Sequence, residues 1–243
     1  MKINSTEEEL LGSIKEGVRY SGIALLDEHA GRLAAFGAAV LEQNRRMNLT
    51  RIDSVREFAA KRIVDSLFGL TVLPDVVKCI DVGSGAGFPG IVLAVTRPES
   101  SFVLLDSVKK KVDFTAEAAE RTGIRNVHSI HGRAEELARD CAYRDQFDFV
   151  VARAVAPLRV LVEYCVPFVM VGGRFAAYKG PGGADEIKEA QNALQILGVE
   201  QDRDEEFELP WGMGVRRILV FRKCRVTPNG YPRRPGSAKR KPL

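Results

Sequence analysis

The amino-acid sequence predicts an α/β fold: a mostly parallel, seven-stranded sheet with helices on both faces, preceded by a helical extension. After Lys78, short apolar runs alternate with segments of helical periodicity, which is typical of parallel sheets covered by helices. A run with glycines at 83, 85, 87 and 90 follows the first apolar run, and such spacing lets a backbone turn tightly. Residues 6–73 lack strand-like alternation and carry apolar residues at helical spacing.

The N-terminal segment predicts helices with one buried face. Leu33, Phe36 and Val40 follow the i, i+3, i+7 spacing of a half-buried helix, and residues 63–70 repeat it before Pro74. The stretch between these two helices is basic. Its positive residues are Arg45, Arg46, Arg51, Arg56, Lys61 and Arg62. A solvated helix face and a phosphate-contacting surface both fit these charges, and alone they favour the solvated face.

Six strands and five helices follow in alternation. We expect strands at 78–83, 101–106, 126–130, 147–152, 172–179 and 216–222, and helices at 89–97, 108–122, 133–139, 156–168 and 184–197. A short strand near Glu205–Leu209 is expected to form an antiparallel hairpin with the last strand and to complete the seven. The chain therefore divides into a helical segment (1–75), a cofactor-binding domain (76–223) and a basic, proline-rich tail (224–243).

The bulk properties predict a soluble, cytoplasmic protein. A chain of 243 residues buries a sufficient core without disulfides. Its four cysteines are widely spaced and form no C-x-x-C pair, which favours buried reduced thiols. The sequence has no apolar run long enough for a membrane helix, and its acidic N-terminus is unlike a signal peptide.

The tail carries a charge opposite to that of the body. Residues 225–243 hold six basic residues and no acid, which exceeds the net charge of +4 and leaves the body near −2. Four prolines in the tail forbid a regular helix or a central strand. A terminus of this kind typically binds nucleic acid or is disordered, and the composition favours nucleic acid slightly.

The glycine run allows two interpretations beyond a plain turn. Gly85-x-Gly87-x-x-Gly90 matches the dinucleotide fingerprint, which places a pyrophosphate at a helix N-terminus. In the other register, Asp81 precedes Gly83 by two residues, where its carboxylate would repel pyrophosphate and suit an ammonium group. S-adenosylmethionine carries such a group on its amino-acid end, so the residues favour that cofactor over a dinucleotide.

A second acid supports a nucleoside site. The next predicted strand ends in Asp106, about 20 residues beyond the glycines, where doubly wound folds bind ribose hydroxyls. The order of strand, loop, helix, strand and acid makes a plain structural turn the weaker interpretation.

Four matches together resemble the RsmG (GidB) family of small-subunit (16S) ribosomal RNA guanine-N7 methyltransferases. They are Asn48-Leu-Thr50, the run from Asp81 to Gly90, Leu104-Leu-Asp-Ser107 followed by lysines, and Arg153-Ala154 with Tyr178-Lys-Gly180. The resemblance extends from about residue 33 to the end of the tail. It implies a class I methyltransferase (Rossmann-like) fold, S-adenosylmethionine as methyl donor, and ribosomal RNA in the small subunit as acceptor.

The resemblance also implies the cofactor-binding residues. Backbone contacts would come from Gly83 and Phe88, and Gly85 and Gly87 of the same loop are further cofactor-binding candidates. Asp106 would hold the ribose, Ala134 and Glu135 would flank the adenine, and Arg153 would face the methionine end or the incoming base. One departure stands out: where the family commonly has histidine, this chain has Arg62, whereas Asp65 in the same motif is kept.

The chemistry of guanine N7 fits the residues. The fourth predicted strand ends in Ala152-Arg153-Ala154, without the Asp/Asn-Pro-Pro-aromatic motif of exocyclic amine methyltransferases, and no cysteine is placed as a nucleophile. Guanine N7 carries no proton, so its methylation needs positioning rather than a general base. We expect Arg153 to orient a carboxylate or phosphate and Lys179 to contact an RNA phosphate or guanine O6.

Other assignments are weaker. His128 and His131 lack a third ligand, so no metal is expected. A small-molecule methyltransferase and a cofactor-sensing regulatory module are the alternatives, and a dehydrogenase is disfavoured by Asp81. We expect a monomer. RNA affinity that depends on salt and falls when residues 225–243 are deleted would favour the RNA enzyme.

Overall fold

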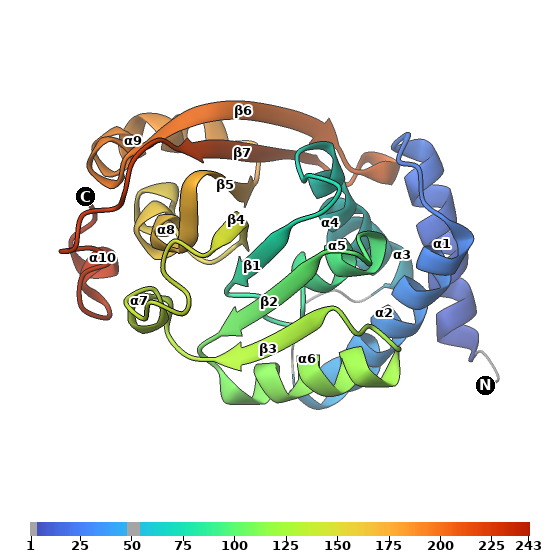
Figure 1. The fold of residues 1–243 in the computed structure, drawn as a ribbon. Helices are drawn as coiled ribbons and strands as arrows, with labels where there is room; N and C mark the ends of the chain where they lie inside the picture. Colours follow the sequence, from blue (N-terminus) through green and yellow to red (C-terminus); the bar gives the residue numbers. More distant parts are fainter. Residues whose placement is uncertain (1–3, 48–53) are drawn as a thin grey trace.

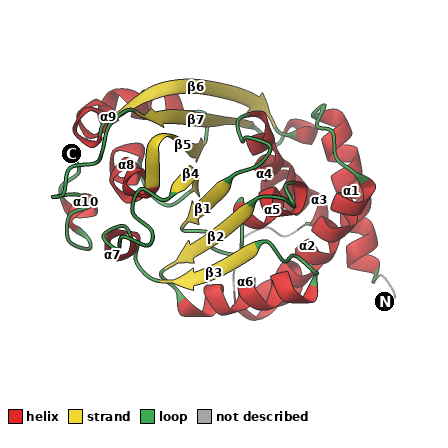
Figure 2. Ribbon diagram, viewed as in Figure 1, coloured by secondary structure: helices red, strands yellow, loops and turns green. Residues whose placement is uncertain are grey.

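The computed structural model describes residues 4–47 and 54–243. Within them, seven strands form one sheet in the order β3-β2-β1-β4-β5-β7-β6 (Figure 2). The strands are β1 Lys78–Val82, β2 Ser101–Asp106, β3 Val127–His131, β4 Phe147–Arg153, β5 Val169–Lys179, β6 Val199–Glu208 and β7 Val215–Lys223. The first five run parallel, and β7 runs antiparallel to both β5 and β6. The predicted fold class is confirmed.

The closing hairpin is longer than the sequence predicts. The strand expected near Glu205–Leu209 extends over all of β6, and β5 begins at Val169. β6 has few apolar residues because it is an edge strand that leaves most side chains exposed. Cross-strand ion pairs to β7 hold its register, with Arg217 bonded to Asp204 at 2.6 Å and paired with Glu206. Hydrophobic periodicity alone could not have found such a strand.

Helices cover both faces of the sheet (Figure 1). One face carries α1 Ser5–Tyr20, α2 Asp27–Met47, α4 Asp65–Leu67, α5 Gly90–Thr96 and α6 Lys109–Arg121, whose buried side chains share one hydrophobic cluster with the sheet. The opposite face carries α7 Ala134–Leu137, α8 Leu158–Cys165 and α9 Gly183–Leu197 over a second cluster. The N-terminal helices are therefore a layer on the sheet, with a core in common.

Phe88 joins this layer to the glycine loop. Its ring lies 5.3 Å from that of Phe36 on α2 and 5.7 Å from that of Phe58 on α3 Val55–Phe58. Such aromatic contacts stabilise packing beyond simple burial. The first helices thus buttress the loop that the sequence singles out as the cofactor site.

The helix after residue 54 is irregular. α3 continues into a π-helical turn at Ala59–Val64, then α4, then a 3₁₀ turn at Phe68–Thr71. π-Helical turns are rare and frequently occur at functional sites. The motif that the sequence shares with the family, residues 61–66, lies across this turn, whereas Asn48-Leu-Thr50 lies outside the described residues.

The tail packs on the body, so disorder does not describe it. The guanidinium of Arg144 donates to the carbonyl O atoms of Tyr231 (2.8 Å) and Thr227 (2.8 Å). Arg233 binds the fully buried carboxylate of Glu163 through both its backbone and its side chain. A short helix, α10 Ser237–Arg240, lies beside α7 and α8 (Figure 1). At least one tail cation is therefore used for folding.

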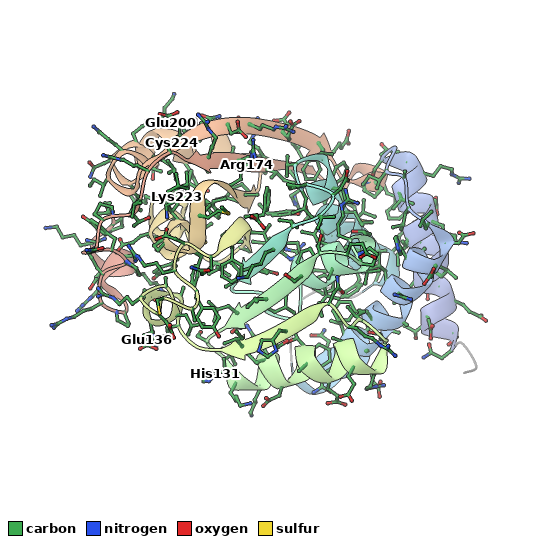
Figure 3. All side chains as sticks on the ribbon, in the orientation of Figure 1. His131, Glu136, Arg174, Glu200, Lys223 and Cys224 are labelled. Atoms are coloured by element: carbon green, nitrogen blue, oxygen red, sulfur yellow. The ribbon has the colours of Figure 1, made fainter. Side chains whose placement is uncertain are left out.

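Next to the start of the tail, a buried lysine fixes the end of β7. Lys223, labelled in Figure 3, is fully buried, and its Nζ donates to the carbonyl O atoms of Val166 (3.1 Å) and Val169 (2.7 Å). It also pairs with Asp145. Burial lowers the pKa of this ammonium group, and the Asp145 carboxylate opposes that shift.

Two further findings bear on the bulk predictions. Cys79 and Cys165 are buried, but Cys141 and Cys224 are exposed, so the expectation of buried thiols holds for two of them. In the described part of the chain, no helix has the length and apolarity to cross a membrane.

Candidate active site

Two cavities open at the carboxyl ends of the parallel strands, where open α/β sheets bind ligands. The Asp106 cavity, of about 370 Å³, is bordered by the ends of β1 and β2, by α7 and by the tail. The Arg153 cavity, of about 450 Å³, is bordered by the ends of β4 and β5, by the start of β7 and by the helix of residues 55–67. Ala154 borders both, and its φ of +55° is unusual for a residue with a side chain. Strain of this kind is typical of functional sites.

Close approach explains the glycines of the loop. Gly83 has a φ of +77°, and a Cβ there would lie 2.6 Å from a methyl of Val155. A Cβ at Gly90 would lie 2.3 Å from a Leu104 methyl and 2.8 Å from the Asp81 carboxylate. Only glycine therefore fits at either position. Of the loop glycines in the predicted site, Gly83 borders the Asp106 cavity, whereas Gly85 and Gly87 do not.

Asp106 organises this cavity. One of its carboxylate oxygens accepts the Gly85 N–H at 2.9 Å, and the other accepts the Val108 N–H at 2.8 Å. A carboxylate has about four acceptor positions, so each oxygen can still accept a hydroxyl of a ligand. The side chain borders the cavity while 7 % exposed. This arrangement fits a ribose.

Ala134 and Glu135 begin α7 and border the same cavity, as the family resemblance implies. The Glu135 carboxylate accepts the backbone N–H of Gly236 at 2.9 Å. This contact brings the tail to the cavity, which Gly236 and Lys239 help to line. Sequence reasoning missed both tail residues, because a contact across about a hundred positions has no local signal.

Asp81 lies beneath the loop and is fully buried. One carboxylate oxygen accepts the Gly90 N–H at 2.8 Å, and the other has no hydrogen-bond partner among the described residues. Burial raises the pKa of Asp81 to about 7, against the Gly90 hydrogen bond and the charge of Arg153. Asp81 does not border the Asp106 cavity. In this structure it anchors the start of α5.

Phe88 borders neither cavity. Its backbone N–H donates to the carbonyl O of Ser84 at 3.1 Å. The guanidinium of Arg153 lies over its ring at 5.5 Å. A backbone contact from Phe88 to a cofactor would therefore use its carbonyl oxygen.

Arg153 is a buried anchor of the second cavity. Its Nη1 donates to the Asp65 carboxylate (3.1 Å), the Ser66 hydroxyl (3.1 Å) and the Arg62 carbonyl O (3.4 Å). The hydroxyl of Tyr178 donates to the carbonyl O of Ser66 at 3.0 Å. β4 and β5 thus hold the turn of residues 62–66 through these polar contacts.

Lys179 is also paired. Its Nζ donates to the Glu186 carboxylate at 2.8 Å and to the Ala156 carbonyl O at 3.0 Å, and its side chain is 8 % exposed. Both Arg153 and Lys179 border the cavity, as predicted from their strand ends.

The cavity is cationic on balance. It is lined by five basic side chains (Lys61, Arg62, Arg153, Lys179, Arg216) and three acidic ones (Glu57, Asp65, Glu186). Burial, then the charge of Arg153, lowers the pKa of Arg62 to about 10. Arg216 and Glu186 escaped sequence analysis. Arg216 lies at the start of an antiparallel strand, and a start in that direction falls at the carboxyl edge, so the predicted hairpin was a usable signal.

No cluster of three or more metal-ligating side chains occurs in residues 4–47 and 54–243. His131, at the end of β3 in Figure 3, contacts the Ser107 carbonyl O at 3.2 Å.

This sheet order, with a glycine loop after β1 and a carboxylate at the end of β2, defines an S-adenosylmethionine-dependent methyltransferase fold. The fold resembles an O-methyltransferase from Bacillus cereus (TM-score 0.57, 17% identity, 78% of this chain and 91% of that one). It also resembles TrmN from Thermus thermophilus (TM-score 0.52, 18% identity, 74% and 53%).

The family follows from sequence comparison. The family model GidB, rRNA small subunit methyltransferase G, matches residues 30–210. The ribosomal RNA small subunit methyltransferase G of Alkaliphilus metalliredigens is 42% identical over 95% of this chain and 97% of its own. That of Acetivibrio thermocellus is 40% identical over 99% and 100%. The chain belongs to this methyltransferase family, as its motifs predict.

Proposed function

We propose that this chain methylates N7 of a guanine in the ribosomal RNA of the small subunit, with S-adenosylmethionine as donor, and acts as a monomer in the cytoplasm. The observation that carries the proposal is the pair of adjoining cavities. One offers a carboxylate with spare acceptor positions, and the other is lined by an excess of basic groups. Family membership supplies the reaction class.

The residues of the Asp106 cavity fit the cofactor. Asp106 would accept the ribose hydroxyls, Ala134 and Glu135 would flank the adenine, and the glycines would allow close backbone approach. When bound, S-adenosylmethionine supplies an electrophilic methyl group on a sulfonium. The loop glycines and Phe88 would fix that end beside Ala154, at the boundary with the second cavity.

The residues of the Arg153 cavity suit an acceptor that needs no deprotonation. Guanine N7 attacks with a lone pair, and the N–CH₃ bond forms as the S–CH₃ bond breaks, so no base is required. Arg153 would orient the cofactor carboxylate or the base through its fixed position on Asp65 and Ser66. Lys179 would contact a phosphate or guanine O6 while it also donates to the Glu186 carboxylate.

Lys179 gives a direct check on this assignment. If it contacts the acceptor, Lys179→Ala lowers RNA affinity or turnover while cofactor affinity is retained. Unchanged affinity and turnover would remove Lys179 from the site and leave it as a structural ion pair of β5 and α9.

The alternatives predict different behaviour. An enzyme acting on a small molecule would transfer methyl groups without any dependence on basic surface residues, and a regulatory module would bind cofactor without turnover. The basic lining of the acceptor cavity favours a polyanionic acceptor.

The test is transfer of labelled methyl from S-adenosylmethionine to small ribosomal subunits that lack the modification, followed by nucleoside analysis. Label in 7-methylguanosine is the expected result. Absence of label in both subunits and naked ribosomal RNA, with cofactor binding intact, would overturn the proposal.

A further inference from the structure

Asp65 has a buried carboxylate oxygen that accepts no hydrogen bond from the described residues. The residue is 5 % exposed and borders the Arg153 cavity. Its Oδ2 accepts Arg153 Nη1 at 3.1 Å, but its Oδ1 has no hydrogen-bond partner among the described residues. A buried carboxylate oxygen without a partner is costly, because it has lost water and gained nothing in exchange. The ion pair with Arg153 therefore provides a partner for only one of the two carboxylate oxygens.

The surroundings orient the carboxylate. Burial raises the pKa of Asp65 above its ordinary value, and the charges of Arg153, Arg216 and Arg62 oppose that shift. Arg153 also donates to Ser66, so the guanidinium that holds Oδ2 is itself fixed. Asp65 thus lies among cationic groups, and the residue borders a cavity large enough for a base.

We infer that Asp65 reads the acceptor base, with Oδ1 accepting hydrogen bonds from N1–H and the 2-amino group of guanine. This inference rests on the proposed function and adds the residue that selects the base. Guanine presents two adjacent donors on this edge. Adenine presents one donor beside a ring nitrogen lone pair, which a carboxylate would repel.

The orientation agrees with the reaction. N7 belongs to the imidazole ring of guanine, on the side away from N1 and the 2-amino group. A base held at Asp65 by its Watson–Crick edge therefore leaves N7 free. The Asp65 side of the cavity is joined to the cofactor side through Ala154, which borders both. Asp65 would act as a specificity-determining residue that touches the substrate.

The experiment uses acceptor RNA that carries either guanosine or inosine at the position that the wild-type protein methylates. Inosine keeps N7, O6 and N1–H and lacks only the 2-amino group. We expect the wild-type kcat/KM to fall about 10- to 100-fold with inosine, the range for one hydrogen bond to a charged acceptor. In Asp65→Asn, Arg153 would hold the amide oxygen and turn the NH₂ group toward the base. The guanosine preference should then fall to near unity.

Two controls keep the result interpretable. Glu57→Gln alters another carboxylate of the same cavity, one paired with Lys61 at 2.6 Å, and should retain the wild-type guanosine-to-inosine ratio. Cofactor affinity of Asp65→Asn should match the wild type, which shows that the variant folds. Its melting temperature should fall, because the buried Arg153 loses its charged partner.

Each other outcome counts against a specific claim. A wild-type enzyme that treats both RNAs alike, or an Asp65→Asn variant that keeps the wild-type ratio, would overturn the inference alone. Equal loss on both RNAs would make Asp65 a positioning residue for Arg153. Failure of the wild type to methylate any RNA would overturn the proposed function, and this inference with it.

Discussion

The two cavities at the carboxyl edge differ in whether the buried polar atoms of their side chains have hydrogen-bond partners. In the Asp106 cavity, both oxygens of Asp106 accept backbone N–H groups, and Glu135 accepts one from Gly236. In the Arg153 cavity, one oxygen of Asp65 and the Nε of Arg62 have no partner among the described residues. Buried polar groups are normally paired. The difference indicates a cofactor side that is preformed and an acceptor side that its ligand completes.

The largest effect is expected from breaking the buried pair of the acceptor side. Arg153→Ala would leave the Asp65 carboxylate buried and uncompensated, which typically costs about 3–5 kcal/mol of stability. Methyl transfer should also be lost. Urea unfolding and transfer assays measure the two effects. The matched change Arg32→Ala, in an exposed pair with Glu28, should cost no more than about 1 kcal/mol. Full transfer by Arg153→Ala would show that the cavity works without its anchor.

The buried carboxylate of Asp81 lies beneath the glycine loop and gives a pH-dependent test of the cofactor side. Its pKa of about 7 in the folded protein exceeds the ordinary value of 3.8, so the native state binds a proton that the unfolded chain has lost. Stability therefore falls as pH rises through this window, by about 2–3 kcal/mol between pH 5 and 8. Asp81→Asn should remove this part of the pH dependence of unfolding. A variant with the wild-type pH profile would show that Asp81 is an ordinary carboxylate.

Asp106 gives a prediction for cofactor affinity on the other side of the comparison. Asp106→Ala removes acceptors for the ribose and for the loop N–H groups, and should weaken cofactor binding by about 1–3 kcal/mol, measured by calorimetry. RNA affinity should be unaffected. Asp113→Ala, in an exposed pair with Lys109 on α6, is the control and should leave cofactor affinity unchanged. Undiminished affinity in Asp106→Ala would remove the ribose assignment.

The smallest effect concerns the tail. Lys239 borders the Asp106 cavity and is exposed, so Lys239→Ala should weaken cofactor binding by about 0.2–1 kcal/mol, and less at high salt. Lys241 is also exposed and does not border the cavity, so Lys241→Ala should have no effect on cofactor affinity. The same loss from both variants would indicate general electrostatics, with no specific wall formed by the tail.

The sequence predicted the cofactor side better than the acceptor side, for a physical reason. Gly83, Asp106 and Ala134 follow consecutive strands of a parallel sheet, so their spacing along the chain fixes their meeting at one edge. Glu186 and Arg216 reach the acceptor cavity from a later helix and an antiparallel strand. Only the pairing of strands, not any local pattern, brings them there.

Charge was the least predictable property. Arg153 and Lys179 could be placed at strand ends, but not their partners Asp65 and Glu186, which neutralise much of their charge. The tail illustrates the same point. Its composition favoured nucleic-acid binding, whereas the buried Glu163 uses Arg233 for packing. Long-range ion pairs leave no trace in periodicity or in counts of charged residues.

The π-helical turn at Ala59–Val64 matters for any redesign of this chain. Such a turn is equivalent to one residue inserted into an α-helix, and each residue rotates a helix by about 100°. Deleting a single residue from it would give a smoother helix and still turn Asp65 away from Arg153 or Phe58 away from Phe88. The irregular segment thus fixes the rotation about the helix axis between Phe58 and Asp65. Insertions and deletions in this helix should be tolerated only when they preserve that rotation.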